Sequence, residues 1–172
     1  MNNKLFIIGI LSIIILLSGC FNNEKTNAIY LIPEGYTGHA MAFYDVKGAP
    51  QLTYEGDFAV HIINEEGYFA TSKSDMTYGT VTDQYYFVDE NGTRTLADNR
   101  CIRVLGTGGY ESYGEGDEAL VDIKYTGIVI TEDCSDEFPY AVDNFEDEKK
   151  QATLNRVLDK YYSIQDENSG SE

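Results

Sequence analysis

The chain has 172 residues, with 12 Lys+Arg against 29 Asp+Glu and a net charge of −17. Such a charge excludes nucleic-acid binding through phosphate neutralisation, and a hydrophobic content of 42% with 13% aromatic residues excludes a wholly disordered acidic chain. The length fits one or two small domains, so we expect a folded core. Two His, three Cys and no Trp leave few residues for a catalytic centre, and we expect no cofactor.

The first twenty residues predict an export signal. Lys4 precedes an apolar run over residues 5–17, which is several residues shorter than the about 20 that a membrane-spanning helix needs. The run ends in Leu17-Ser18-Gly19-Cys20, which resembles the lipobox of bacterial lipoproteins, where Cys receives a diacylglycerol and the peptide is cut before it. This resemblance predicts removal of residues 1–19 and lipid attachment at Cys20, on the outer face of the cell membrane.

Two acyl chains are enough for stable membrane anchoring. Removal of residues 1–19 would leave 11 basic against 29 acidic residues, a charge of −18. Residues 20–28 then form a polar tether, which reaches at most about 30 Å. We expect anionic headgroups to repel the acidic domain, so that it stands off the membrane.

Cys101 and Cys134 remain as an even pair outside the cytoplasm, which favours a disulfide. A bridge would close a loop of about 34 residues and contribute roughly 3.8 kcal/mol by loop entropy. Two free buried thiols are the alternative. A metal site is disfavoured because zinc ligands are paired at short spacings, which neither Cys offers.

Residues 29–142 predict an antiparallel β-sandwich of about seven strands. Short runs rich in Val, Ile, Tyr, Phe and Thr recur between Gly-containing breaks. The Asn91-Gly92 pair between two such runs is a strong hairpin signal. The expected strands are 29–32, 39–46, 51–54, 59–63, 84–89, 93–96, 100–105 and 119–130.

In the C-terminal part the spacing of apolar residues changes to steps of three and four, which predicts one amphipathic helix over residues 143–165. Leu154, Val157, Leu158, Tyr161 and Tyr162 recur at three- and four-residue steps without Gly or Pro. We expect this helix to pack on the sandwich or on a partner. Residues 166–172 are polar and are expected to be disordered.

Residues 30–38 (YLIPEGYTG) and 85–94 (YYFVDENGTR) together resemble an uncharacterised family of small exported proteins of Gram-positive bacteria, many of which resemble lipoproteins. The resemblance covers residues 29–130 and implies no activity and no catalytic residues. A weaker likeness to transthyretin-like modules lies in the Lys47-Gly48-Ala49-Pro50 turn between two strands.

Acidic residues concentrate in residues 111–148, which hold 13 Asp+Glu and one Lys. A solvated acidic face is the favoured interpretation. A calcium site would need six to eight converging oxygens, and the stretch matches no spaced calcium loop. A basic partner is the third interpretation.

The glycine-rich segment 106–109 matches neither a dinucleotide-binding pattern nor a P-loop, so we interpret it as a mobile turn. Tyr110 and Tyr113 beside it form a candidate ligand surface that could stack on a sugar or peptide.

His39 and His61 lie on predicted strands among apolar residues, so we expect buried histidines with satisfied hydrogen bonds. A cell-envelope hydrolase would instead need a cavity that gathers one of them with a Ser or a carboxylate. The sequence shows no Gly-x-Ser-x-Gly elbow, and Asp89 and Glu90 would point to opposite faces of a strand.

The sequence therefore predicts a membrane-anchored binding or interaction module rather than an enzyme. Its expected partners are the membrane and an envelope protein, peptide or glycan. The alternatives are the envelope hydrolase and a structural or sensory accessory protein.

Overall fold

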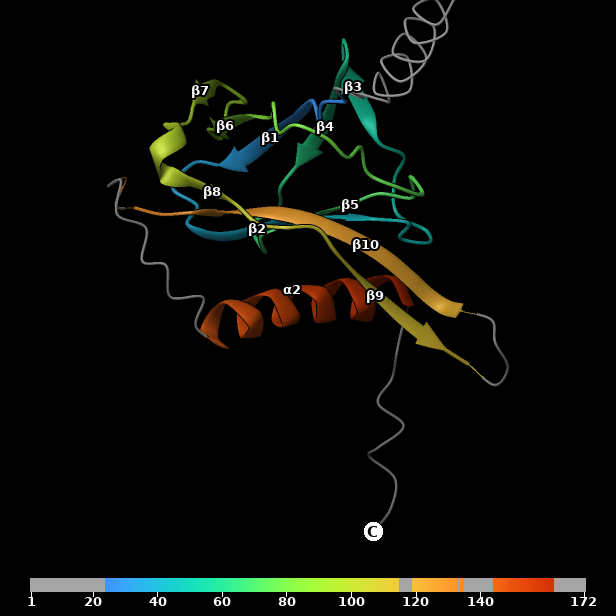
Figure 1. Cartoon of the computed structure of the whole chain (residues 1–172). Coiled ribbons are helices and arrows are strands. Elements are labelled where there is room, and N and C mark those ends of the chain that lie inside the picture. Colours follow the sequence, from blue (N-terminus) through green and yellow to red (C-terminus); the bar gives the residue numbers. More distant parts are fainter. Residues whose placement is uncertain (1–23, 115–118, 133, 135–143, 163–172) are drawn as a thin grey trace, which may run out of the picture.

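The computed structural model describes residues 24–114, 119–132, 134 and 144–162. They form three layers, in which two β-sheets pack face to face and a helix covers the outer face of the second sheet (Figure 1). The predicted signal peptide, Cys20 and the tail 166–172 lie outside the described residues.

Each sheet has five strands. Sheet 1 has the order β3-β4-β1-β6-β7, and sheet 2 has the order β5-β2-β10-β8, with β9 also paired to β10. The strands of sheet 1 are β1 (Ala28–Pro33), β3 (Thr53–Glu55), β4 (Phe58–Ile62), β6 (Gln84–Val88) and β7 (Arg94–Leu96). Those of sheet 2 are β2 (Gly38–Tyr44), β5 (Tyr68–Ala70), β8 (Ile102–Val104), β9 (Gly108–Tyr113) and β10 (Ala119–Ile130).

The prediction of a mainly β sandwich with one C-terminal helix is confirmed, but the sheets are mixed rather than antiparallel. β1 runs parallel to both β4 and β6, and β2 runs parallel to β5. Side-chain alternation identifies a strand but not the direction of its neighbour, so the sequence could not reveal these pairings. Two strands were missed, because β5 has three residues and β9 begins with Gly108-Gly109.

Strand β2 is buried along nearly its whole length because both of its faces are covered. Ala40, Ala42 and Tyr44 belong to the core between the sheets, whereas Met41 and Phe43 belong to the core under the helix. A strand covered on both faces is apolar throughout instead of alternating. β2 is therefore the central strand of the three-layer arrangement.

Helix α2 (Asn144–Tyr162) lies within the predicted range 143–165. Leu154, Val157 and Leu158 are buried against sheet 2, as their spacing predicts. At the C-terminal end, the Tyr162 hydroxyl accepts a hydrogen bond from the Lys47 N–H (3.2 Å) and donates one to the Asp45 carbonyl (3.3 Å). The helix is thus held both by apolar packing and by the loop after β2.

The predicted hairpin at Asn91-Gly92 is confirmed between β6 and β7. Gly92 has φ = +81°, and Asp89 Oδ1 accepts hydrogen bonds from the N–H groups of Asn91 (2.9 Å) and Thr93 (2.7 Å). Positive φ is accessible to glycine at little cost, so this residue permits the tight turn.

The two edge strands of sheet 1 contact each other through an ion pair. Glu55 on β3 and Arg94 on β7 form two hydrogen bonds, of 2.6 and 2.8 Å, although three strands lie between them in the sheet order. Sheet 1 is therefore strongly curved.

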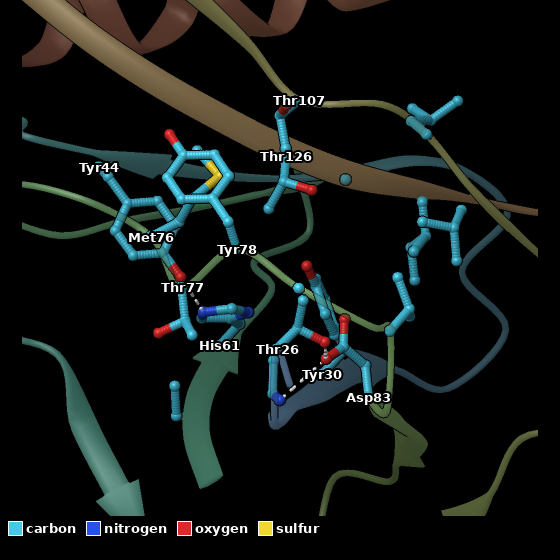
Figure 2. A pocket seen from close by; sticks show the side chains of 18 of the residues that line it. Thr26, Tyr30, Tyr44, His61, Met76, Thr77, Tyr78, Asp83, Thr107 and Thr126 are labelled. Atoms are coloured by element: carbon cyan, nitrogen blue, oxygen red, sulfur yellow. Dashed lines mark hydrogen bonds between the residues drawn. The ribbon is translucent and has the colours of Figure 1, made fainter. Parts of the chain in front are cut away.

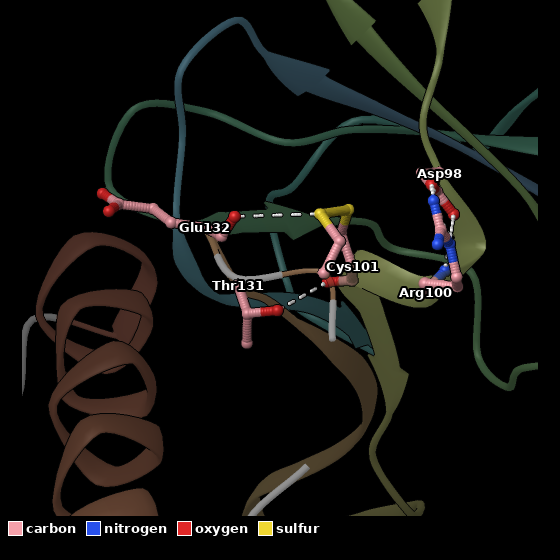
Figure 3. The surroundings of a disulfide bond; sticks show 6 residues. Asp98, Arg100, Cys101, Thr131 and Glu132 are labelled. Atoms are coloured by element: carbon pink, nitrogen blue, oxygen red, sulfur yellow. Dashed lines mark hydrogen bonds and ion pairs between the residues drawn. A yellow bond between two sulfur atoms is a disulfide. The ribbon is translucent and has the colours of Figure 1, made fainter. Parts of the chain in front are cut away.

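Cys101 and Cys134 form a disulfide (Figure 3). Cys101 ends the 3₁₀ turn η1 (Asn99–Cys101), which Asp98 caps by accepting a hydrogen bond from the Arg100 N–H. The Cys101 carbonyl also accepts a hydrogen bond from the Thr131 N–H (3.0 Å). These contacts join the start of β8 to the segment that follows β10.

The folded domain begins earlier than the predicted boundary at residue 29. The Thr80 N–H donates to the Glu24 carbonyl (2.8 Å), and the Thr26 N–H donates to the Thr80 carbonyl (3.1 Å). Residues 24–28, predicted as tether, therefore pack on the loop before β6. Polar composition suggested a free segment, but these contacts are hydrogen bonds, which hydropathy does not reveal.

Candidate functional site: a cavity between the sheets

A cavity of about 260 Å³ lies between the two sheets at one end of the sandwich (Figure 2). Its walls come from β1, β2, β4 and β10 and from the segments 76–79 and 104–107. The residues around it are distant in sequence, and only the packing of the two sheets brings them together.

His61 and Tyr44 form one wall. The Tyr44 hydroxyl and His61 Nε2 are 2.7 Å apart, and the edge of the His61 ring meets Tyr30 with ring centroids 4.7 Å apart. His61 is 1% exposed, and its Nδ1 is buried without a hydrogen-bond partner among the described residues. Burial lowers the pKa of His61 to about 4, so the ring is neutral at physiological pH.

Figure 2 shows that the second ring nitrogen of His61 points away from Tyr44, toward the side of the cavity where Thr26 and Asp83 lie. A buried polar atom without a partner is uncommon in folded proteins and costs about 1–3 kcal/mol. The cavity can hold the partner that this nitrogen lacks.

Asp83 lies across the cavity from His61 (Figure 2). The Thr26 hydroxyl and the Ala28 N–H (2.9 Å) both donate hydrogen bonds to its Oδ1. Burial raises the pKa of Asp83, while these two donors act in the opposite direction. Both donors bind Oδ1, so Oδ2 is the oxygen that could accept a hydrogen bond from a ligand.

Three buried tyrosines surround these two groups. Burial raises the pKa values of Tyr30, Tyr44 and Tyr85 well above the ordinary range, so each keeps its hydroxyl proton. The hydroxyl of Tyr85, which packs on the Tyr30 ring, is buried without a hydrogen-bond partner among the described residues. This part of the inter-sheet core is therefore polar.

Four of the residues that line the cavity are exposed apolar side chains, and we call these four the rim because exposed lining residues mark its solvent side. Its members are Tyr54, Tyr78, Val81 and Val104, with exposed fractions of 54, 49, 48 and 45%. Large apolar side chains that gather around an opening are typical of binding sites, whereas single exposed ones are common anywhere on a surface.

The chain enters the fold beside this cavity. Thr26 and Ala28 line it, and Gly79 packs directly on the backbone of Glu24. Gly79 has φ = +153°, and a Cβ at this position would overlap the Glu24 carbonyl. Glycine is therefore required where the first described residues meet the loop before β6.

The structure does not bring together the candidate ligand residues Tyr110 and Tyr113. They lie on opposite faces of β9: Tyr110 packs against the core under α2, and Tyr113 is 59% exposed with its hydroxyl bonded to Glu111. Gly106 and Thr107 of the neighbouring glycine-rich segment line the cavity instead.

The two histidines have different environments. His39 is buried on the face of β2 that Met41 and Phe43 share, toward α2, whereas His61 lies in the cavity. His61 is buried as expected, and its Nδ1 has no hydrogen-bond partner among the described residues.

No group of three or more His, Cys, Asp or Glu residues able to hold a metal ion occurs in the described part of the chain. Much of the acidic stretch, including residues 115–118 and 135–143, lies outside it. Within the same described ranges, no helix has the length and hydropathy needed to span a membrane.

Sequence patterns did not identify Asp83, Tyr44 or Tyr30 as cavity residues. Each belongs to a different strand or loop, and only Tyr30 lies in a segment singled out from the sequence, residues 30–38, which carried a family resemblance and no site role. The one usable signal was the isolated His61 within an apolar strand.

A family model of unknown function, DUF6843, matches residues 24–138. The chain is also similar to a crystal structure described as a "putative lipoprotein" from Bacillus anthracis, with a TM-score of 0.68 and 31% identity. The match covers 81% of this chain and 99% of that one. Comparison with curated proteins found no match.

Proposed function

We propose that this chain, which belongs to the DUF6843 family of unknown function, is a lipid-anchored binding module on the outer face of the cell membrane. Its ligand would occupy the cavity between the sheets. The family assigns no activity, so the proposal rests on the cavity and on the N-terminal sequence.

The anchor rests on Leu17-Ser18-Gly19-Cys20 and on the similarity to a protein described as a lipoprotein. Cys20→Ser should release the protein from the membrane fraction, because no acyl chain can then be attached. If the variant still fractionates with membranes and resists extraction like the parent, the anchor is wrong.

The observation that carries the binding role is the buried Nδ1 of His61, which faces the cavity and has no partner in the part of the chain that the structure describes. Water can occupy a polar cavity of this size, and a ligand with a hydrogen-bonding group would replace it. Asp83 offers an acceptor on the opposite wall, and the tyrosine rings offer apolar surface. This combination fits a small organic molecule with a polar end and an apolar flank.

Binding can be mapped by NMR on the domain from residue 21, using a library of small polar and aromatic fragments. We expect bound fragments to shift the methyl signals of Met76 and Ile128, which line the cavity. Thr107→Trp should weaken this binding several-fold by filling the opening. Thr95→Trp, at an exposed threonine of β7 outside the cavity, is the matched control.

Fragments that bind only elsewhere, or equally well in Thr107→Trp, would contradict the proposal. Each variant's thermal unfolding should be recorded first, so that loss of fold is not mistaken for loss of binding.

A hydrolase is the second candidate, and the presence of His61 and Asp83 in one cavity favours it. Against it, His61 Nε2 contacts Tyr44, and the residues that line the cavity include neither Ser nor Cys. Hydrolysis of simple esters that disappears in His61→Gln, with the fold intact, would favour the hydrolase over the binding module.

A further inference from the structure

We infer that the rim of the inter-sheet cavity, formed by Tyr54, Tyr78, Val81 and Val104, binds the surface of the lipid bilayer to which the protein is anchored. The inference rests on the proposed anchor at Cys20. It adds the orientation of the domain and the route by which a ligand reaches the cavity.

The first argument is the place where the chain leaves the fold. Glu24 is the first described residue, and it is hydrogen-bonded to Thr80, between the rim residues Tyr78 and Val81. Three residues lie between Cys20 and Glu24 in the sequence, and the four residue-to-residue steps span at most about 14 Å. A lipid on Cys20 therefore holds this end of the domain, and no other, next to the bilayer.

The second argument is the distribution of exposed apolar side chains. Eight large hydrophobic residues are exposed in the described part of the chain, and four of them form the rim. Two of these four are tyrosines, whose apolar rings and polar hydroxyls suit the boundary between headgroups and acyl chains. The apolar patch thus lies where the tether brings it against lipid.

The third argument concerns charge. Lys25 and Lys73 lie at this end of the domain, and Asp75 beside them is paired with Lys124 (3.4 Å). Repulsion between the acidic remainder and anionic headgroups is screened beyond about 8 Å at physiological ionic strength. The expected stand-off from the membrane treats the negative charge as uniform. At this end, however, Lys25, Lys73 and Lys124 balance Glu24, Asp75 and Asp83, so the local charge is close to zero.

An opening on the bilayer would admit an amphiphile from the membrane surface. Its polar end would reach His61 and Asp83, and its apolar part would remain among the rim side chains and the lipid. The cavity has the matching polarity, polar inside and apolar at its opening.

The test uses the full lipidated protein in phosphatidylglycerol vesicles that contain a lipid with a nitroxide on its headgroup. A fluorophore is attached to Val81→Cys at the rim or to Leu96→Cys on β7 as the control, since both positions are exposed and apolar. We expect several-fold stronger quenching at position 81 than at position 96. Equal quenching at both, or none at 81, would overturn the inference.

A second variant separates rim binding from the effect of a short tether. A flexible spacer of about 15 Gly and Ser residues, inserted between Asn23 and Glu24, allows the domain to move well away from the bilayer. Strong quenching at position 81 should persist when the spacer is present. It should fall when Tyr54→Ser and Tyr78→Ser are added to the spacer variant. A fall to the level of position 96 caused by the spacer alone would overturn the inference.

These outcomes are independent of the fragment mapping proposed above. A rim that does not contact lipid leaves fragment binding in the cavity intact. If no fragment binds in the cavity, the proposed binding function is contradicted, but the quenching result is unaffected.

Discussion

The two cores on either side of sheet 2 differ in one respect, because a cavity lies beside the core between the sheets. The core under α2 is built mainly from apolar side chains such as Phe43, Ile123, Leu154 and Val157, with Tyr68 and His39 also buried on that side of the sheet. The core between the sheets contains buried tyrosines and His61, and at one end it leaves a cavity of about 260 Å³. Of these two cores, the one between the sheets is thus the one that contributes walls to this cavity.

The difference indicates that the cavity is not required for stability. Apolar side chains of suitable size would fill the space and remove unpartnered polar atoms, and filled cores are more stable. The cavity end of the inter-sheet core therefore carries a cost in stability, which is expected where a site must stay open for a ligand.

The first prediction concerns the disulfide. Cys101 and Cys134 join the end of the inter-sheet core that is remote from the cavity, because Cys101 precedes β8 while Leu105 and Gly106 after β8 line the cavity. Replacing both by Ala should lower the free energy of unfolding by about 4 kcal/mol, through the entropy of the closed loop. Urea denaturation measures this loss.

Thiol titration of the denatured, unreduced domain provides the control. No reactive thiol is expected from Cys101 and Cys134. Two titratable thiols would show that the bridge does not form.

The second prediction compares the same substitution in the two cores. Leu154→Ala, at a buried position of the core under α2, should lower the free energy of unfolding by about 2–5 kcal/mol. Leu52→Ala, at the wall of the cavity, should cost only about 1 kcal/mol, because little packing is lost beside an open space. Equal losses in chemical denaturation would mean that the cavity wall is packed as tightly as the other core.

The third prediction concerns pH. Burial lowers the pKa of His61 from 6.5 to about 4, so the unfolded chain binds a proton at pH values where the folded protein does not. Stability should therefore fall as pH is lowered from about 6.5 to 4, with a His61 contribution of about 3 kcal/mol. Denaturation of the parent and of His61→Gln across this range isolates the contribution. The same pH slope in both would contradict the burial of a neutral ring.

The smallest effect is expected at Asp83, whose pKa is raised by burial. Its carboxylate thus weakens the folded state above that pKa, and this cost disappears as pH falls through it. Asp83→Asn keeps an oxygen for Thr26 and Ala28, and at pH 7 its stability should lie within about 1 kcal/mol of the parent. A loss as large as that of Leu154→Ala would assign Asp83 a structural role.

The sequence predicted most of the fold because local patterns were strong. The period of Leu154, Val157 and Leu158 identified α2, and Asn91-Gly92 identified the hairpin between β6 and β7. The parallel pairings of β1 and the three-residue β5 depend on contacts between distant segments, which no local pattern encodes.

The cavity was harder to predict than the fold. It depends on Tyr44, His61 and Asp83, which come from two strands and a loop and meet only after the sheets pack. Tyr113 was predicted to belong to a ligand surface because aromatic residues beside glycines can stack on a sugar or peptide. Its partner Tyr110 instead serves the core under α2, since the two occupy opposite faces of β9.

The central claim is that the cavity binds a ligand through His61. Its most direct test is the imidazole ¹⁵N spectrum of His61, recorded with and without a saturating amount of the tightest fragment from the NMR screen. We predict that the Nδ1 resonance shifts on binding while Nε2, held by Tyr44, changes little. A fragment that binds at saturation and leaves both His61 resonances unchanged would contradict the claim.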